Sequence, residues 1–394
     1  MLRFVKIMDR LRNPYQPGAG TRPPALIGRD ELIDGFGVTL RRTLTGRSGK
    51  SCMLIGLRGV GKTVLLNRFA EIAEAEGVQV GFIEAPENGD FRTLLAVRLR
   101  RVLLEWNGRV RRAVTTALGV LKSFTLKLPG GASIAIGVDA LAGRADSGLL
   151  AEDLTDLLVA AGEAAATCDS ALMVAVDEVQ YLSGDELAAL VTAIHRTTQL
   201  GLPVLLTGAG LPQLPALVGA ARSYAERLFE FPAVGSLPPE EAAAAIVVPA
   251  EALGVELTST AVDRVVTESS GYPYFLQEWG YHVWNAAPSS PITVDDVNSV
   301  RAGVVDTLDR DFFRVRFDRL TPKEKDYLRA MAVLGPGRHR SGDIAAALGV
   351  KVESVAPRRS GLIAKGMIYS PAHGDTAFTV PLFDQFLLRA IPDR

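Results

Sequence analysis

The chain has 394 residues, of which 48% are hydrophobic and 22% charged, and its formal net charge is −1. This composition excludes disordered and fibrous proteins, and the length predicts two or three domains. The near-neutral charge excludes a surface coated for nucleic acid, so any such contact must be a local patch. Cys52 and Cys168 predict buried thiols in a reducing cytosol. Because no apolar run reaches transmembrane length and residues 1–12 carry scattered charges, we expect a cytoplasmic protein.

Residues 13–29 are rich in proline and glycine and predict an extended, irregular segment before a first helix over residues 30–42. Two interpretations of this segment remain open. It could lie over the base of a bound nucleotide, or it could be a flexible leader.

The most informative stretch lies between an apolar strand, residues 52–55, and a helix over residues 63–75. Its glycine spacing, followed by lysine and threonine, fits a phosphate-binding loop in the required strand–loop–helix context. Glycines let backbone N–H groups surround a triphosphate, the lysine reaches the β- and γ-phosphates, and the threonine hydroxyl holds Mg²⁺. We therefore expect ATP and Mg²⁺ as cofactors. The candidate nucleotide-binding residues here are Gly56, Leu57, Arg58, Gly59, Val60, Gly61, Lys62, Thr63 and Val64.

The next elements are a strand over residues 78–85 and a helix over residues 91–112 with seven arginines and one glutamate. That basic helix either binds a phosphate backbone or presents a solvated face. Alternating apolar residues on either side of Pro129-Gly130-Gly131 predict a hairpin around residues 124–138. A helix over residues 149–166 follows.

A second stretch with chemistry is the apolar strand over residues 172–176, which ends in Asp177 and Glu178. In ATPases with a phosphate loop, the first such acid supports Mg²⁺ and the second polarises the attacking water. We therefore expect Asp177, with Thr63, at the metal and Glu178 as the catalytic base.

Further downstream, Thr207 is predicted at the polar end of a strand over residues 204–207, where its hydroxyl could contact the γ-phosphate or the water. Arg222 and Arg227 follow in a segment that closes the core. An arginine there could stabilise transition-state charge in its own subunit or in a neighbour. For both residues, a surface salt bridge is the alternative.

Beyond Pro238-Pro239 the pattern is helical, with helices over residues 240–248, 259–269 and 274–286 and a connecting helix over residues 294–316. Pro273 fits the first turn of its helix.

The last 75 residues predict three helices and a β-hairpin, which is a winged helix-turn-helix. Residues 338–365 contain six basic and two acidic residues, a local net charge of +4 that suits duplex DNA. The candidate DNA contacts are Arg358, Arg359 and Lys365. Winged helices also bind proteins or inhibit their own chain, and Pro357 within the third helix is unfavourable for groove entry.

The phosphate loop, the acidic strand end, Thr207, the helical lid and the winged helix occur in the order found in AAA+ ATPases. The chain resembles the origin-recognition and initiator branch of that family and the related STAND regulatory ATPases. The resemblance implies an α/β fold, in which an AAA+ core with a parallel sheet precedes a helical lid and a C-terminal winged helix-turn-helix. It also implies adenine contacts from Ile27, Gly28 and Arg29, and from Pro273 in the Gly-x-Pro lid motif of STAND proteins. Initiators usually carry a sensor arginine at that lid helix, and this chain does not.

The implied parts are an extended segment over residues 1–29, a core over 30–235, a lid over 236–317 and a winged helix over 318–394. Two functions compete for this arrangement. One is ATP-dependent DNA binding or assembly, in which copies of the chain could associate with one another. The other is a signalling switch whose winged helix is autoinhibitory or binds a protein partner.

Overall fold

The computed structural model describes residues 7–18, 20–47, 49–87, 89–106, 111–128, 135–372 and 374–392. The chain forms two compact units. The sheet unit comprises Arg29–Gly56 and Lys62–Ala233. The helical unit comprises the residues up to Gly28, the segment Leu57–Gly61 and the residues from Val234 onward. The predicted lid and winged helix both belong to the helical unit.

The sheet unit is built on five parallel strands in the order β2-β3-β4-β1-β5. They are β1 (Ser51–Ile55), β2 (Gln79–Glu84), β3 (Leu172–Asp177), β4 (Val204–Gly210) and β5 (Phe229–Glu230). β3 and β4 are buried along their whole length, as expected for parallel strands covered on both faces. All five strands point the same way, so the segments that follow them meet at one edge of the sheet.

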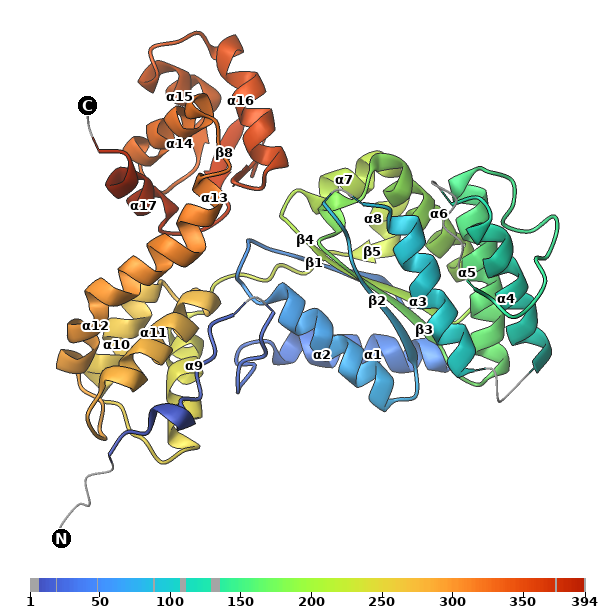
Figure 1. Cartoon of the computed structure of the whole chain (residues 1–394), viewed down its shortest axis with the longest axis horizontal. Helices are drawn as coiled ribbons and strands as arrows, with labels where there is room; N and C mark the ends of the chain where they lie inside the picture. The colour runs from blue at the N-terminus through green and yellow to red at the C-terminus, as the bar shows by residue number, and fades with distance from the viewer. Residues whose placement is uncertain are drawn as a thin grey trace. The chain divides into compact units, whose positions relative to one another are not determined.

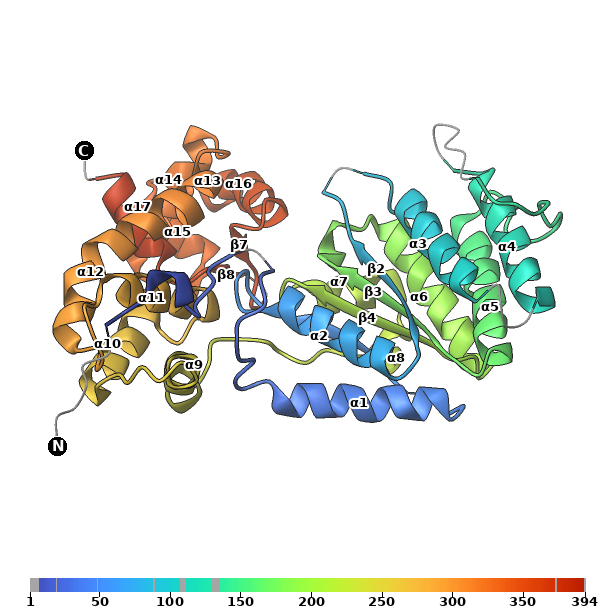
Figure 2. The ribbon, with the colours of Figure 1, turned by 60° about the horizontal axis from the view of Figure 1, so that its bottom comes forward.

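Helices cover both faces of this sheet (Figures 1 and 2). One face carries α1 (Asp30–Leu44) and α2 (Lys62–Ala75), and the other carries α3 (Phe91–Glu105), α5 (Leu150–Thr167) and α6 (Gly184–Gln199). α4 (Arg111–Thr125) packs outside α3 and α5. Two short helices, α7 (Leu214–Ala221) and α8 (Ala225–Leu228), connect β4 to β5. The unit is therefore the three-layer α/β fold that the sequence predicts.

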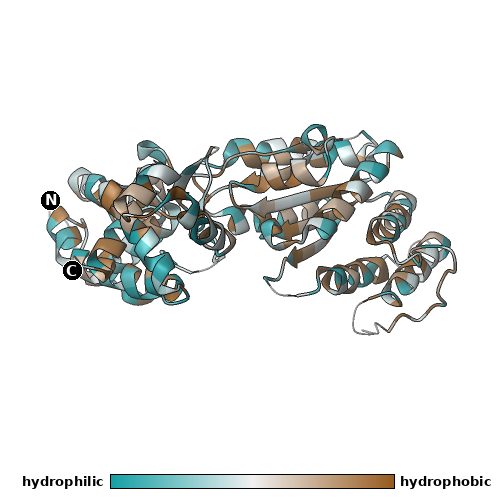
Figure 3. Ribbon diagram, turned by 90° about the horizontal axis from the view of Figure 1, so that it is seen from above, coloured by the Kyte–Doolittle hydropathy of each residue, from teal (hydrophilic) through white to brown (hydrophobic). Residues whose placement is uncertain are grey.

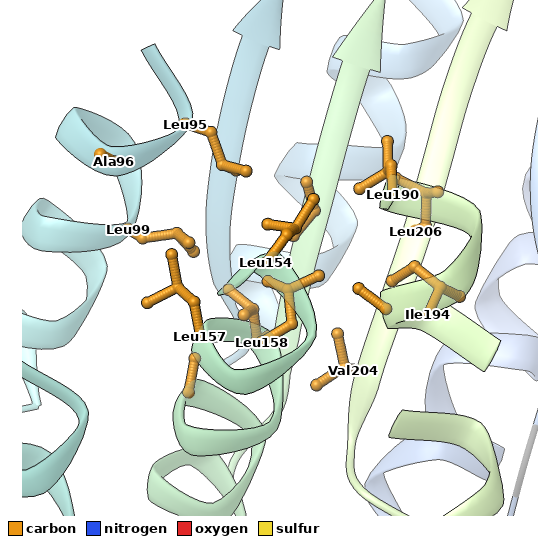
Figure 4. Packing of buried hydrophobic residues seen from close by; sticks show 14 of the residues in the cluster. Leu95, Ala96, Leu99, Leu154, Leu157, Leu158, Leu190, Ile194, Val204 and Leu206 are labelled. Carbon is orange, nitrogen blue, oxygen red and sulfur yellow. The ribbon is translucent and has the colours of Figure 1, made fainter. Parts of the chain in front are cut away.

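The largest hydrophobic cluster of this unit lies between the sheet and α3, α5 and α6. In Figure 4, Leu95 and Leu99 of α3 and Leu157 of α5 approach one another beside the strands. Leu190 and Ile194 of α6 lie next to β4. All of these side chains are at most 1% exposed. Burial of each contributes about 1.5–3 kcal/mol, which fixes the strands whose ends carry the polar residues.

Two sequence predictions in this unit are wrong. The helix expected over residues 91–112 is two helices, because α3 ends at Glu105 and α4 begins at Arg111. The hairpin expected around residues 124–138 is not a hairpin in its described part, since α4 runs to Thr125 and residues 135–138 form no strand. The remainder of that prediction, residues 129–134, lies outside the described residues. The buried residues Ala117, Leu121, Phe124 and Leu128 recur at helical spacing, a pattern that three alternating residues alone do not reveal.

The helical unit begins with an N-terminal segment that packs on α11. The region predicted as the lid contains α9 (Pro239–Glu251), α10 (Ser259–Ser269), α11 (Pro273–Ala286) and α12 (Val294–Thr307). Tyr15 is 2% exposed and lies against Gly280 of α11, where a Cβ atom would stand 2.5 Å from the tyrosine ring. Asn13 donates to the Tyr281 carbonyl, and the Trp284 indole donates to the Asp9 carbonyl. This described part of the segment is therefore anchored, which excludes a flexible leader there.

α12 continues through a π-helical turn, η4 (Leu308–Arg314), and α13 (Val315–Phe317) into the C-terminal part. That part contains α14 (Pro322–Leu334), α15 (Ser341–Ala347), α16 (Val352–Ala364) and α17 (Phe383–Ala390). It also holds a three-stranded antiparallel sheet of β6 (His339–Arg340), β8 (Asp375–Phe378) and β7 (Ile368–Tyr369). The predicted helices and both predicted strands are present, and β6 is an addition. His373 of the expected turn lies outside the described residues.

Figure 3 shows the strands of the large sheet in brown to white, consistent with their burial under helices on both faces. Within the described ranges, no helix has the length and the apolar content that crossing a membrane requires.

Candidate functional site

The phosphate loop starts where β1 ends, and α2 begins inside it at Lys62. Gly59 and Gly61 have backbone φ angles of +83° and +91°, which residues with a Cβ atom rarely adopt. The Gly56 amide donates to the carbonyl of Gly210 at the end of β4, at 3.1 Å, which fixes the loop's first residue to the sheet. Within the sheet unit, the N-terminus of α2 and the Gly56 amide therefore lie at the carboxyl edge of the sheet, and a helix N-terminus of this kind can bind phosphate.

Lys62, Thr63 and Asp177 lie together in the sheet unit. The Lys62 side chain is 6% exposed, and its ammonium donates to the Gly56 carbonyl at 3.0 Å. The Thr63 hydroxyl donates to Asp177 Oδ2 at 2.6 Å, although the two residues are 114 positions apart in the chain. A hydroxyl and a carboxylate side by side are the protein ligands that Mg²⁺ takes in phosphate-loop ATPases, with phosphates and waters filling the other positions.

Burial raises the pKa of Asp177, and the charge of Glu178 adds to that effect. The Thr63 hydrogen bond, the Glu178 amide and the charge of Lys62 act in the opposite direction. A divalent cation at Asp177 would favour the carboxylate form, so the residues present fit a bound Mg²⁺. Among the described residues no group of three histidine, cysteine, aspartate or glutamate side chains could hold a metal, and a phosphate-loop magnesium site does not need one.

Glu178 directly follows β3 and adopts the left-handed conformation, with φ 54° and ψ 41°. For a residue other than glycine this conformation costs about 1–3 kcal/mol and is concentrated at functional sites. Its amide donates to Asp177 Oδ1 at 2.8 Å, and its half-buried carboxylate accepts a hydrogen bond from the Gln180 carboxamide. The sequence alone does not indicate a role for Gln180, because a glutamine two residues beyond a pair of acids is not part of a phosphate-loop ATPase motif.

The sequence predicted that Thr207 ends its strand. This prediction is wrong, because β4 continues to Gly210. The expected end relied on the polarity of threonine, but Gly208, Ala209 and Gly210 extend the same buried strand. Thr207 pairs with Ala175, two residues before Asp177, and is fully buried. Within the part of the chain that the structure describes, its hydroxyl finds no hydrogen-bond partner.

The two arginines near the end of the sheet unit differ in their surroundings. Arg222 donates to the Thr192 hydroxyl at 3.1 Å and to the Ala221 carbonyl, which gives it a local structural role. Arg227 is exposed on α8 and makes no ion pair within the described ranges. Of the two, Arg227 is thus the one free to meet another molecule.

The loop segment Leu57–Gly61 belongs to the helical unit, where two tyrosines at the start of α11 bond to it. The Tyr272 hydroxyl donates to the Arg58 carbonyl, and the Tyr274 amide donates to the Gly59 carbonyl at 3.2 Å. A Cβ atom on Gly59 would stand 3.1 Å from the Tyr272 ring, a tight contact that favours glycine at this position. Pro273, between the tyrosines, occupies the first turn of α11, where proline fits.

The residues before the first helix are divided between the units. Ile27 and Gly28 are half-buried in the helical unit, where a Cβ atom on Gly28 would lie 2.1 Å from the Glu241 carboxylate. Gly28 also has a φ angle of +70°, a backbone conformation that favours glycine. Arg29 belongs to the sheet unit and is the N-cap residue of α1.

The three predicted DNA contacts on and after α16 have different environments. Arg359 donates to the Thr376 and Ser370 hydroxyls and to the Asp375 carbonyl, so it ties α16 to the small sheet. Lys365 forms an ion pair with Glu324 at 2.7 Å. Arg358 is half-buried and makes no ion pair among the described residues. Two of the three therefore already serve the internal structure.

The comparison with known families identifies the region that holds this site. Residues 25–207 match the family described as an AAA ATPase domain. This stretch is an AAA ATPase domain. The match includes the phosphate loop, Asp177 and Glu178, and the parallel sheet agrees with an AAA+ P-loop ATPase fold for this part of the chain. A second match covers residues 310–387 and belongs to a family described only as a domain of unknown function.

One solved structure shows a fold similar to that of this chain, and two others align with lower scores. A Walker-type ATPase of Pyrococcus abyssi aligns over 94% of this chain and 98% of its own, with a TM-score of 0.58 and 15% identity. The Thermotoga maritima RuvB Holliday junction branch migration motor aligns over 90% and 95%, with a TM-score of 0.45 and 16% identity. Aeropyrum pernix Orc1 in complex with DNA aligns over 94% and 94%, with a TM-score of 0.44 and 16% identity. No functionally curated protein matches the sequence.

Proposed function

We propose that this ATPase binds MgATP at Gly56–Val64 and hydrolyses it with Glu178 as the general base. The observation that carries the proposal is the 2.6 Å hydrogen bond between Thr63 and Asp177, which joins the phosphate loop to the acidic strand end. In the proposed mechanism, Lys62 exchanges the Gly56 carbonyl for the β- and γ-phosphates. Thr63 and Asp177 would hold Mg²⁺, which neutralises charge on the phosphates.

The proton of the attacking water passes to the Glu178 carboxylate in this proposal. Glu178 is suited to the task because it directly follows Asp177 and is half-buried, so it is both near the metal ligands and open to solvent. Thr207 lies within β4, two residues behind the level of Asp177. A direct contact of its hydroxyl with the γ-phosphate is therefore not part of the mechanism.

We further propose that Arg227 acts on ATP bound by a neighbouring subunit, because it is exposed and free of ion pairs among the described residues. Arg227→Ala is then expected to bind ATP normally and hydrolyse it slowly. Mixing Arg227→Ala with Glu178→Gln should restore part of the activity, since one interface in the mixture combines both intact groups.

The measurement is phosphate release from equimolar mixtures at increasing protein concentration. Arg222→Ala is the matched control, because this nearby arginine bonds within its own subunit. An Arg227→Ala mixture with no recovered activity would argue for a role within the same subunit or a structural one.

For the C-terminal part we propose a winged helix that binds duplex DNA without strong sequence preference. The support is the +4 charge of residues 338–365 together with the exposed cations that remain, Arg340 and Lys351, and the half-buried Arg358. Lys351 and Arg358 lie at the start and in the middle of α16. Cations placed this way along one helix can neutralise successive phosphates.

Lys351→Ala combined with Arg358→Ala is expected to weaken duplex binding for all sequences. The slope of the logarithm of the association constant against the logarithm of salt concentration should decrease in magnitude by roughly two, because two phosphate contacts are lost. Fluorescence anisotropy over a salt series measures both quantities. Arg314→Ala combined with Lys323→Ala is the control, since it removes the same charge from exposed positions outside α16. Arg359 is left intact because its loss would release the small sheet.

A second candidate function is a nucleotide-controlled switch, and one observation favours it. A Cβ atom on Gly366, after α16, would lie 2.9 Å from the Arg58 guanidinium of the phosphate loop. Together with the bonds from Tyr272 and Tyr274, this places residues 57–61 among lid and C-terminal residues of the helical unit. If the C-terminal part controls the loop, the α16 double variant changes basal ATP turnover or ADP release and leaves DNA affinity unchanged.

A further inference from the structure

Gln180 connects the proposed catalytic base to the segment that follows β4. It lies in the single helical turn η3 (Val179–Tyr181) directly after Glu178. Its Nε2 donates to Glu178 Oε2, and its Oε1 accepts from the Leu211 amide at 3.1 Å. The orientation of the carboxamide follows from these partners, because a backbone amide can only donate and a carboxylate can only accept.

The end of β4 explains why a glutamine fits there. Gly208, Ala209 and Gly210 offer no polar side chain that could reach Glu178 from this strand. A Cβ atom on Gly210 would stand 2.9 Å from Gln180 Oε1, so the carboxamide fills the space beside that glycine. Gln180 therefore supplies, from the turn after β3, the polar group that β4 lacks.

Two restraints together hold Glu178. The left-handed backbone and the bond from its amide to Asp177 fix the main chain, and the Gln180 bond fixes one carboxylate oxygen. The other oxygen, Oε1, has no hydrogen-bond partner among the residues that the structure describes, and it can accept a proton from water. A hydrogen bond to a charged group in a half-buried site is strong enough to decide the orientation of such a side chain.

We propose that Gln180 is a positioning residue that holds Glu178 ready for the attacking water and ties it to the β4–α7 turn. The inference rests on the proposed function, in which Glu178 is the base. Because Leu211 leads through α7 to α8 and Arg227, a displacement of this segment would change the Leu211–Gln180 bond. The orientation of the Glu178 carboxylate would then depend on any molecule that binds to α7 and α8.

Two variants separate the parts of this role. Gln180→Glu keeps an acceptor for the Leu211 amide but removes the donor to Glu178, and Gln180→Met removes both. Each is expected to lower kcat for ATP hydrolysis about ten- to a hundredfold, while the Kd for ATP and the melting temperature stay close to those of the parent. Gln199→Glu is the matched control, because it makes the same chemical change at the exposed end of α6.

The decisive measurement combines Gln180→Met with Glu178→Gln in one full-length chain. If Gln180 acts through Glu178, the double variant hydrolyses ATP no more slowly than Glu178→Gln alone. Losses that multiply, or a parental kcat in both Gln180 variants, would overturn the inference while leaving Glu178 as the base. A parental rate in Glu178→Gln itself would instead overturn the proposed function.

Discussion

Lys62→Ala is expected to abolish detectable ATP binding, with the Kd rising at least about a hundredfold. The ammonium is buried and bonded to the Gly56 carbonyl within the loop, so no other cation of that segment takes its position. Without it the β- and γ-phosphates lose their charged partner, while the glycine amides remain. Calorimetric titration with MgATP measures the affinity directly.

Lys50→Ala provides the control for that titration. Lys50 is an exposed lysine of the sheet unit, 4.0 Å from Glu230, and a surface ion pair of this kind contributes little to stability. Its removal should leave ATP affinity unchanged. An unchanged affinity in a folded Lys62→Ala protein would contradict the assignment of Gly56–Val64 as the nucleotide site.

Glu178→Gln is expected to bind ATP with parental affinity and to hydrolyse it about 10²–10⁴-fold more slowly. The substitution keeps the size and shape of the side chain and removes the group that accepts the proton of water. The left-handed backbone of residue 178 is also kept, since glutamine has the same branching as glutamate. Phosphate release at saturating ATP, with the Kd measured on the same preparation, separates binding from chemistry.

Asp177→Asn serves as the comparison for the base variant. It removes a metal ligand and leaves Glu178 in place, so the Mg²⁺ concentration needed for half-maximal turnover should rise. If Glu178→Gln turned over ATP at the parental rate, Glu178 would not be the base, whatever the result for Asp177.

Local patterns predicted the elements that carry chemistry. The glycine spacing of the phosphate loop and the apolar strand ending in Asp177 and Glu178 each depend on neighbours in sequence, and the structure has both. The contact between Thr63 and Asp177 followed from the motif, because parallel strands end at a common edge. These predictions needed no knowledge of distant packing.

The predictions that failed depended on tertiary context. The end of β4 was placed at Thr207, but buried glycine and alanine continue the strand to Gly210. The hairpin around residues 124–138 gave way to α4, whose apolar face packs against α3 and α5. The spacing of apolar residues and the polarity of single residues over so short a stretch do not distinguish a hairpin from a helix or locate the end of a buried strand.

Side-chain partners were the least predictable feature. Arg359 and Lys365 counted toward a basic patch, yet both bond within the C-terminal part, to the small sheet and to Glu324. The bonds of Gln180 to Glu178 and Leu211 join residues that only the folded sheet brings together. A count of charges along the sequence does not show which cations the fold itself uses.

The most direct test of the account is phosphate release by the parental protein at saturating ATP, with and without Mg²⁺, beside Lys62→Ala and Glu178→Gln. We predict turnover by the parental protein that stops when Mg²⁺ is chelated. We predict no nucleotide binding by Lys62→Ala, and bound but unhydrolysed ATP in Glu178→Gln. Parental turnover that persists in the Glu178→Gln protein, or that is indifferent to Mg²⁺, would contradict a hydrolysis site built from Thr63, Asp177 and Glu178.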